Sequence, residues 1–216
     1  LQTVQAPCKI NLHLGIYAEK DARGYHRVDS VMVPVGLFNT ITIESAPETS
    51  VAFEPSFDGL VRGNATQRAI ELLSRALGVE EGVSVRIERR IPSGGGLGSS
   101  SADAGSVLRA LAERWDVDPL DQRVVDVARR VGADVAFFLN PVPSLLRGAG
   151  DVLENTFPVL GGVPLALVMP ADCASSTREV YEEFDRVPTA PESPDALCDT
   201  LARGDVPGVA AHLYNN

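Results

Sequence analysis

Apolar and polar residues alternate along the first part of the chain in the way that is typical of β-strands. Ile10, Leu12, Leu14 and Ile16 occupy every second position, so Lys9 and the residue at position 11 share the opposite face. The residues at 21–24 predict a turn, and further strands are predicted at 28–37 and 40–44. We expect these three strands to form an antiparallel meander.

Helical spacing begins at residue 64. Apolar residues recur at three- and four-residue intervals over 64–77, and Gly78 is the expected end of that helix. Val83, Val85 and Ile87 alternate with polar residues in a strand, which precedes a second helix with apolar positions over 104–115. Helices are also predicted at 120–131 and 176–185, a strand at 164–169, and short helices after a proline-rich linker at 188–194. This mixed order predicts an α+β fold rather than regular parallel βαβ units.

The segment IPSGGGLGSSSAD at 91–103 joins that strand to the second helix. Glycines without a Cβ let backbone N–H groups approach a phosphate, serine hydroxyls add donors, and a helix N-terminus carries unpaired N–H groups and a positive dipole end. The segment therefore predicts a nucleotide-phosphate site. It is neither a P-loop, which ends in Gly-Lys-Ser/Thr, nor a Rossmann fingerprint. A flexible Gly/Ser connector is the alternative, against which the immediately following helix argues.

The composition narrows the class of protein. A length of 216 residues suits one large domain or two small ones, and 44% hydrophobic residues is ordinary for a soluble globular protein. The net charge of −10 argues against nucleic-acid and membrane partners, so local donors must hold any nucleotide. Cys8, Cys173 and Cys198 lack metal-ligand spacing and favour free thiols in the cytoplasm. We find neither a signal peptide nor an apolar run near the roughly 18 residues of a membrane span.

Two segments resemble motifs of the GHMP small-molecule kinases. APCKINLHL at 6–14 is similar to their amino-terminal motif, and 92–104 to their phosphate-binding motif. Within this superfamily, DARGYH at 21–26, GADV at 132–135 with Phe137, and Ser176-Thr177 followed by Val180-Tyr181 are together similar to the 4-diphosphocytidyl-2-C-methyl-D-erythritol kinase family of the non-mevalonate isoprenoid pathway. The resemblance implies the GHMP kinase fold, with an amino-terminal ATP-binding domain of the ribosomal protein S5 domain 2-like type at 1–150 and the start of a carboxyl-terminal α/β domain at 151–216.

The resemblance also implies ATP and Mg²⁺ as cofactors, and phosphorylation of the 2-hydroxyl of a small-molecule partner, the cytidine diphosphate conjugate of methylerythritol. Phosphoryl transfer requires an aligned nucleophile and neutralised oxygen charge. Asp134 is the candidate general base, and Lys9 is the cation that lowers its pKa and stabilises the transferring group. The alternatives are a turn-capping role for Asp134 and a solvated strand face for Lys9.

The resemblance assigns ATP binding to residues of the glycine loop, without assigning protein ligands for Mg²⁺. Ser99 and Ser100 stand where the family has two more glycines, but hydroxyls are donors too, so we expect phosphate binding to be retained. The segment LNPVP at 139–143 replaces a small glycine-containing turn after Asp134. The ATP-binding residues are Pro92, Gly94, Gly95, Gly96, Leu97, Gly98, Ser99, Ser100, Ser101 and Asp103.

A cytosine ring offers two flat faces for stacking and one polar edge. The resemblance assigns Tyr25 and Tyr181 to the faces, His26 to the edge, and Asn11 to the substrate near the reacting hydroxyl. The alternatives are that Tyr25 and His26 form a turn packed on the sheet, and that Tyr181, three residues before Phe184, belongs to a helix core. His13 is not assigned.

The third GHMP motif, a glycine-rich loop near the carboxyl terminus, does not occur before Asn216, and the first residue is Leu1 rather than Met. We therefore expect the sequence to be part of a longer chain. A homoserine- or mevalonate-type kinase and a non-catalytic nucleotide-binding relative are the alternative functions. The former has no need of the GYH sequence at 24–26, and retention of Lys9 and Asp134 argues against the latter.

Overall fold

The computed structural model describes residues 1–55, 64–168 and 177–216. They divide into two compact units that share two long strands, β1 (Gln2–Lys20) and β2 (His26–Ala46). The division at residue 150 that the resemblance implies stays a prediction. The first unit comprises Leu1–Cys8, Val35–Pro92 and Gly98–Pro141, and the second comprises Lys9–Pro34, Ser93–Leu97 and Val142–Asn216.

In the first unit, strand β4 (Gly82–Glu88) lies between β2 and β3 (Ser50–Glu54). It pairs antiparallel with β2 from Thr40↔Glu88 to Ala46↔Gly82, and parallel with β3. Ile41, Ile43 and the predicted inward positions of β4 are buried, because alternate side chains of a strand point to one face. A Cβ at Gly82 would lie 2.5 Å from the carbonyl oxygen of Ala46. Only glycine therefore allows this close approach.

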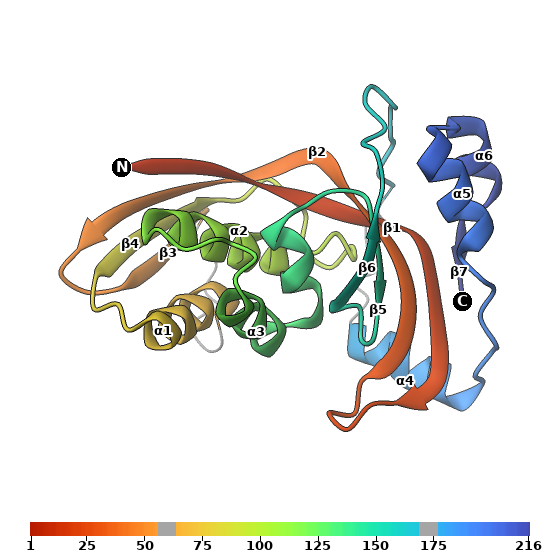
Figure 1. Ribbon diagram of the computed structural model, residues 1–216, viewed down its shortest axis with the longest axis horizontal. Helices are drawn as coiled ribbons and strands as arrows, with labels where there is room; N and C mark the ends of the chain where they lie inside the picture. Colours follow the sequence, from red (N-terminus) through yellow and green to blue (C-terminus); the bar gives the residue numbers. More distant parts are fainter. Residues whose placement is uncertain (56–63, 169–176) are drawn as a thin grey trace. The chain divides into compact units, whose positions relative to one another are not determined.

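Three helices and a 3₁₀-helix complete the first unit: α1 (Ala65–Leu77), α2 (Ser99–Arg114), α3 (Gln122–Val131) and η1 (Ala133–Leu139). The three α-helices lie side by side (Figure 1). The side chain of Asn64 caps the start of α1, and Gly78 ends it in the left-handed conformation at φ 69°, as helix caps favour. The helices predicted in this region are confirmed.

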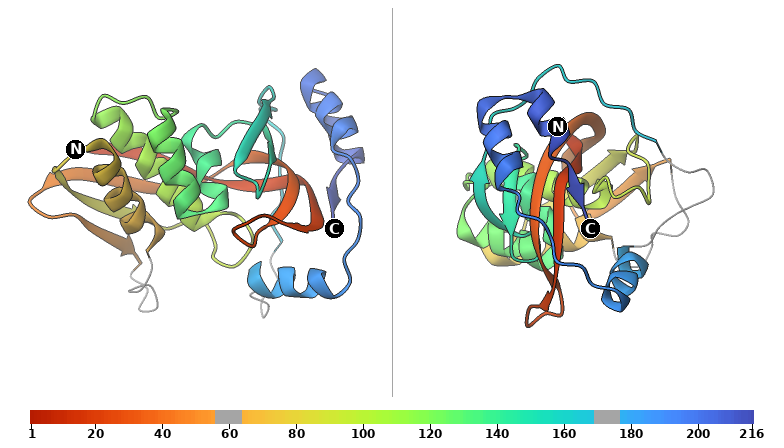
Figure 2. Two further views of the ribbon diagram at one scale, coloured as in Figure 1. Left: turned by 60° about the horizontal axis from the view of Figure 1, so that its bottom comes forward. Right: turned by 90° about the vertical axis from the view of Figure 1, so that its right-hand side faces the viewer.

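The second unit is built around the remaining parts of the two long strands. Strand β1 pairs parallel with β7 (Tyr214–Asn215), whereas β2 pairs antiparallel with β5 (Ser144–Arg147), which pairs with β6 (Val152–Thr156). Its helices are α4 (Thr177–Arg186), α5 (Asp195–Arg203) and α6 (Val206–Ala211), and Figure 2 shows α5 and α6 next to each other. The apolar core of this unit consists of Val31, Leu145, Phe157, Leu197, Leu201 and Val209.

Three predicted strands differ from the structure. Residues 28–37 and 40–44 belong to one continuous strand, β2, because the polar residue between them, Asn39, is fully buried and hydrogen-bonded. Residues 164–168 form no strand: Leu165, Leu167 and Val168 are exposed, and a short apolar run becomes a strand only where a neighbouring strand supplies backbone partners. Met169, Cys173 and Ser176 lie outside the described residues. None of the helices in the described part of the chain could cross a membrane.

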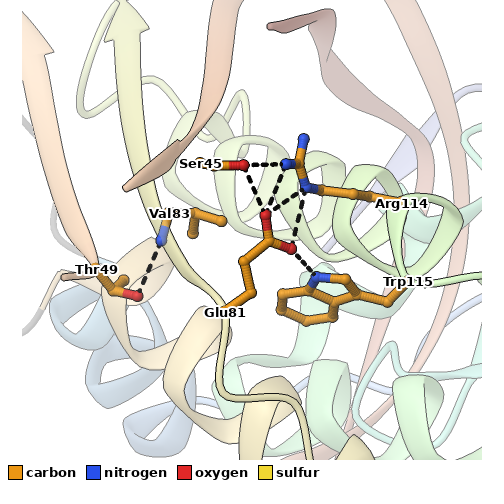
Figure 3. Close-up of polar contacts among 6 residues, drawn as sticks. All are labelled: Ser45, Thr49, Glu81, Val83, Arg114 and Trp115. Carbon is orange, nitrogen blue, oxygen red and sulfur yellow. Dashed lines mark hydrogen bonds and ion pairs between the residues drawn. The ribbon is translucent and has the colours of Figure 1, made fainter. Parts of the chain in front are cut away.

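A polar cluster around Glu81 joins the ends of three elements in the first unit (Figure 3). The guanidinium of Arg114 donates to Glu81 Oε1 at 2.7 Å, the indole N–H of Trp115 donates to Oε2 at 2.8 Å, and the hydroxyl of Ser45 donates to Oε1 at 2.8 Å. The hydrogen bond from Arg114 is the main cause that lowers the pKa of Glu81 to about 2, followed by those from Trp115 and Ser45. The charged carboxylate therefore ties the start of β4 to the end of α2.

This cluster predicts loss of stability in acid. A carboxyl whose pKa is lower in the folded than in the unfolded protein stabilises the fold above its unfolded value, near 4.5, and loses that contribution as the pH falls toward about 2. Partial exposure of Glu81 screens the interaction, so we expect Glu81→Gln to lower the free energy of unfolding by about 1–2 kcal/mol at pH 7. Urea unfolding at pH 7, 5, 4 and 3 measures this.

The exposed neighbour Glu80 provides the control, because Glu80→Gln removes one charge without touching the cluster. We expect the wild-type protein and Glu80→Gln to lose stability similarly between pH 5 and pH 3, and Glu81→Gln to lose less. Equal pH slopes in Glu81→Gln and the wild-type protein would contradict the assignment.

Candidate active site

Three glycines of the loop have backbone angles at which a residue with a side chain would be strained. Gly94, Gly96 and Gly98 have φ angles of 78°, 68° and 71°, in the left-handed region that residues with a Cβ rarely adopt. Gly98 is also the N-cap of α2, where no side chain caps the helix. Since the first N–H groups of a helix have no intrahelical partners, they are available to an anion. The local geometry thus agrees with the predicted phosphate loop.

Within the loop, exposure differs from residue to residue. Residues 92–96 and Ser100 are exposed, Gly98, Ser99 and Ser101 are half-buried, and Leu97 is buried. Asp103 is different again, with 1% of its surface exposed, and burial raises the pKa of its carboxyl to about 6. Its Oδ1 accepts a hydrogen bond from Asn39 at 2.8 Å. The structure thus places Asp103 beneath the surface of the first unit, whereas its direct contact with ATP stays a prediction.

Lys9 lies in a row of hydrogen-bonded polar groups in the second unit. Its Nζ donates to Asn11 Oδ1 at 2.7 Å, and Asn11 Nδ2 donates to Ser30 Oγ at 2.8 Å. The backbone N–H of Lys9 donates to the carbonyl of Leu97 at 3.0 Å, which connects β1 to the glycine loop. Lys9 is only 7% exposed. The alternative of a solvated strand face is therefore wrong, and a buried ammonium of this kind suits a role in binding charge.

Asp134 lies in the first turn of η1 and is half-buried. The buried Val135, Phe137 and Phe138 anchor this short helix in the core of the first unit. It packs directly on α2 at Gly105, where a Cβ would lie 2.5 Å from Phe138 Cβ and 2.7 Å from the carbonyl oxygen of Val135. Glycine at position 105 thus allows η1, which carries Asp134, to lie directly against α2. Asp134 and Lys9 belong to different units, so their joint action stays a prediction.

The predicted cytosine-binding residues are brought together only in part. His26 is buried, and its ring stacks on Tyr181 of α4 with centroids 5.4 Å apart and an interplanar angle of 24°. His26 Nδ1 lies 2.7 Å from the carbonyl oxygen of Tyr17; because a carbonyl only accepts, the ring donates from Nδ1. Its Nε2 lies 3.1 Å from Asp185 Oδ1. The structure thus pairs Tyr181 with His26.

Tyr25 is 53% exposed on the turn before β2. The carboxylate of Asp21 accepts hydrogen bonds from the N–H groups of Arg23 and Tyr25 at 2.9 and 3.0 Å, and the Arg23 guanidinium lies over the Tyr25 ring at 5.3 Å. Arg23 also pairs at 3.0 Å with the buried carboxylate of Asp151. The DARGYH segment therefore forms a braced turn that presents Tyr25 to solvent. The sequence analysis missed this role for Arg23.

Asn39 is the other residue that the sequence analysis missed. It lies on β2, and its side chain contacts both flanks of the glycine loop. Its only sequence signal is a polar residue between two apolar runs, which we interpreted as a break between strands.

Comparisons with known proteins place this chain in a family. The family model "GHMP kinases N terminal domain" matches residues 64–140. The 4-diphosphocytidyl-2-C-methyl-D-erythritol kinase of Nocardioides sp. (strain ATCC BAA-499 / JS614) is 37% identical over 99% of this chain and 74% of its own length. The chain belongs to the 4-diphosphocytidyl-2-C-methyl-D-erythritol kinase family. It is therefore an ATP-using kinase of the GHMP superfamily, and the predicted resemblance, fold class and enzyme class are confirmed.

Two solved structures resemble this chain to different extents. A crystal structure of 4-(cytidine 5'-diphospho)-2C-methyl-D-erythritol kinase is 31% identical, with a TM-score of 0.69 over 94% of this chain and 72% of that one. The homoserine kinase from Cytophaga hutchinsonii has a TM-score of 0.60 over 99% of this chain and 71% of that one, but is only 16% identical. The homoserine kinase thus shares the fold alone.

Proposed function

We propose that this chain transfers the γ-phosphoryl group of ATP to the 2-hydroxyl of 4-diphosphocytidyl-2-C-methyl-D-erythritol. The observation that carries the chemistry is the glycine loop, in which three left-handed glycines lead into the uncapped N-terminus of α2. The substrate is inferred from the names of the relatives that match nearly the whole chain. In the reaction the hydroxyl oxygen bonds to the γ-phosphorus, the bond from that phosphorus to the ADP oxygen breaks, and the hydroxyl proton leaves.

The predicted site residues supply the parts that phosphoryl transfer requires. Asp134 accepts the hydroxyl proton as general base, and Lys9 stabilises negative charge on the transferring group. Asn11, whose amide is held by the Lys9 ammonium and by Ser30, orients the substrate near the reacting hydroxyl. The backbone N–H groups of Gly94, Gly96 and Gly98 and the hydroxyls of Ser99, Ser100 and Ser101 hold the phosphates.

We propose Mg²⁺ as the metal cofactor, bound mainly by the phosphates of ATP. Among the described residues, no group of three or more His, Cys, Asp or Glu side chains could hold a metal ion. Mg²⁺ does not require such a group, because it usually keeps several waters and binds through substrate phosphates and one or two carboxylates rather than a protein cage. Bound there, the ion would neutralise phosphate charge. The net charge of −10 supports our further proposal of no nucleic-acid partner. The odd number of cysteines without metal-ligand spacing supports our proposal of a cytoplasmic location.

A panel of acceptors tests the proposed substrate. The purified protein is incubated with ATP, Mg²⁺ and either 4-diphosphocytidyl-2-C-methyl-D-erythritol, homoserine, mevalonate or galactose, and ADP release is followed. We expect turnover with the cytidine conjugate alone. Turnover only with homoserine or mevalonate would favour the alternative kinase, and ATP binding without turnover of any acceptor would favour a non-catalytic relative.

The aromatic residues provide a prediction about substrate recognition. If Tyr25 and Tyr181 stack on cytosine, Tyr25→Ala and Tyr181→Ala should each weaken binding of the cytidine conjugate by about 1–3 kcal/mol, as base stacking on aromatic side chains does. ATP binding should be nearly unchanged, because neither residue belongs to the glycine loop. Calorimetric titration of each ligand measures both effects.

Tyr214 is the matched control for Tyr181, because it too is a tyrosine stacked on a histidine of the second unit, with its centroid 5.0 Å from that of His13. Tyr214→Ala should lower thermal stability without changing affinity for the cytidine conjugate. Unchanged affinity in Tyr25→Ala and Tyr181→Ala would reject the cytosine assignment, and equal weakening of both ligands would point to a role in packing.

A further inference from the structure

Asn39 uses the full hydrogen-bonding capacity of its side chain inside the first unit. It is 0% exposed. Its Oδ1 accepts from the backbone N–H groups of Arg90 and Ile91 at 2.8 and 3.0 Å. Its Nδ2 donates to Ser99 Oγ at 3.1 Å and to Asp103 Oδ1 at 2.8 Å. An amide has two acceptor lone pairs and two donor hydrogens, so all four are in use.

These four bonds connect the two flanks of the glycine loop. Arg90 and Ile91 immediately precede it, whereas Ser99 and Asp103 lie in the first turns of α2, which follows it. The chain from Pro92 to Gly98, with its exposed glycines, runs between these two flanks. Asn39 itself is fixed by β2, whose neighbouring Thr40 pairs with Glu88 of β4. One side chain on a rigid strand therefore fixes both ends of a loop that is rich in flexible glycine.

We propose that Asn39 is a positioning residue, which holds both flanks of the glycine loop so that its N–H groups are preorganised for the phosphates of ATP. This rests on the proposed role of the loop in ATP binding. An anion site made of backbone N–H groups depends on the loop conformation, and glycine has the largest backbone entropy of any residue. Holding the flanks in advance lowers the ordering cost when ATP binds.

Aspartate and leucine are similar in size to asparagine, but neither can make all four of these hydrogen bonds. Aspartate keeps the acceptor for the N–H groups of Arg90 and Ile91, but it loses both donors. It also places a second carboxylate against that of Asp103. The Asp103 carboxylate is buried, and its Oδ2 has no hydrogen-bond partner among the described residues. Leucine fills the space but leaves the Arg90 and Ile91 N–H groups unpaired. Leucine therefore releases both flanks, whereas aspartate releases the flank at Ser99 and Asp103 and adds repulsion between like charges.

Exchanging the two side chains restores the pattern of bonds. In the double variant Asn39→Asp with Asp103→Asn, the carboxylate at position 39 accepts from the N–H groups of Arg90 and Ile91 as before. The amide at position 103 donates to its other oxygen, and the Ser99 hydroxyl donates in place of accepting. The number of charges in the buried pair is unchanged. Rescue by the exchange therefore reports on the bonds themselves, not on side-chain volume or net charge.

The test compares wild type, Asn39→Asp, Asp103→Asn and the double variant by calorimetric titration of ATP, by KM for ATP and for the cytidine conjugate, and by thermal melting. We expect Asn39→Asp to raise both Kd and KM for ATP about tenfold or more, with KM for the cytidine conjugate changed less than about twofold. The double variant should return both ATP constants to within about threefold of wild type.

Asp121→Ala is the control for destabilisation, since Asp121 caps α3 through the N–H of Arg123 at 2.9 Å and lies outside the loop and its flanks. It should lower the melting temperature while leaving Kd for ATP unchanged. An Asn39→Asp variant that melts earlier but binds ATP like wild type, or a double variant that regains melting temperature without regaining ATP affinity, would overturn the proposal. Failure of the wild-type protein to bind ATP would instead reject the role of the loop.

Discussion

Replacing Asp134 by asparagine is expected to lower kcat by about two orders of magnitude or more. The amide keeps the shape of the carboxylate but cannot accept the hydroxyl proton during transfer. The fold around it should be retained, because η1 is anchored by buried Val135, Phe137 and Phe138 and by its close packing on Gly105. Kd for ATP should therefore change by less than about threefold, the signature of a group that acts in the transition state. Steady-state kinetics and calorimetric titration provide the two measurements.

Asp126 supplies the matched control in the same unit. It is exposed on α3 and accepts a hydrogen bond from Gln122 at 2.7 Å, so Asp126→Asn makes the same chemical change at the surface. We expect its kcat within about twofold of wild type, as for a surface substitution that touches no special feature. If Asp134→Asn also kept near-normal turnover, Asp134 would be a structural residue of η1 and the general base would have to be sought elsewhere.

Local signals explain which elements could be predicted from the sequence. Helix α1 carries its own start and stop signals in Asn64 and Gly78, and the glycine loop has a composition that few other local structures require. Strand β2 could not be predicted as one element. The partners of Asn39 are 51, 52, 60 and 64 residues away in sequence, so a pattern read along the chain shows only a polar interruption.

The candidate site shows the same difference between local sequence signals and contacts that join residues far apart in sequence. The alternation along β1 correctly placed Lys9 and Asn11 on one face, but not the burial of Lys9, which depends on how the surrounding chain packs. The stacking of His26 on Tyr181 joins residues on different elements, and the motif resemblance predicted both residues without predicting that they touch each other. Conversely, the short apolar run at 164–168 predicted a strand that the structure does not form. Sequence pattern thus identifies the chemical groups more reliably than their partners.

The second large effect is expected for Lys9→Met, which should lower kcat by about two to three orders of magnitude. Methionine retains much of the apolar length of lysine but has no charge to stabilise the transferring phosphoryl group. It also leaves Asn11 Oδ1 without the donor that now lies at 2.7 Å, so we expect a loss of stability of about 1–3 kcal/mol. Kinetics at saturating substrates and urea unfolding separate these two consequences.

Two further variants decide between a catalytic and a structural role for Lys9. Lys9→Arg keeps the charge but replaces a compact ammonium with a planar guanidinium, so it should recover only part of the lost turnover. Arg203→Met removes a cation from an exposed site of the same unit and should leave kcat within about twofold of wild type. If Lys9 served only to hold Asn11, Lys9→Met would lose stability while kcat of the folded protein stayed near normal. The expected result is the opposite, because a buried ammonium beside the amide that we propose orients the substrate acts most strongly where negative charge develops.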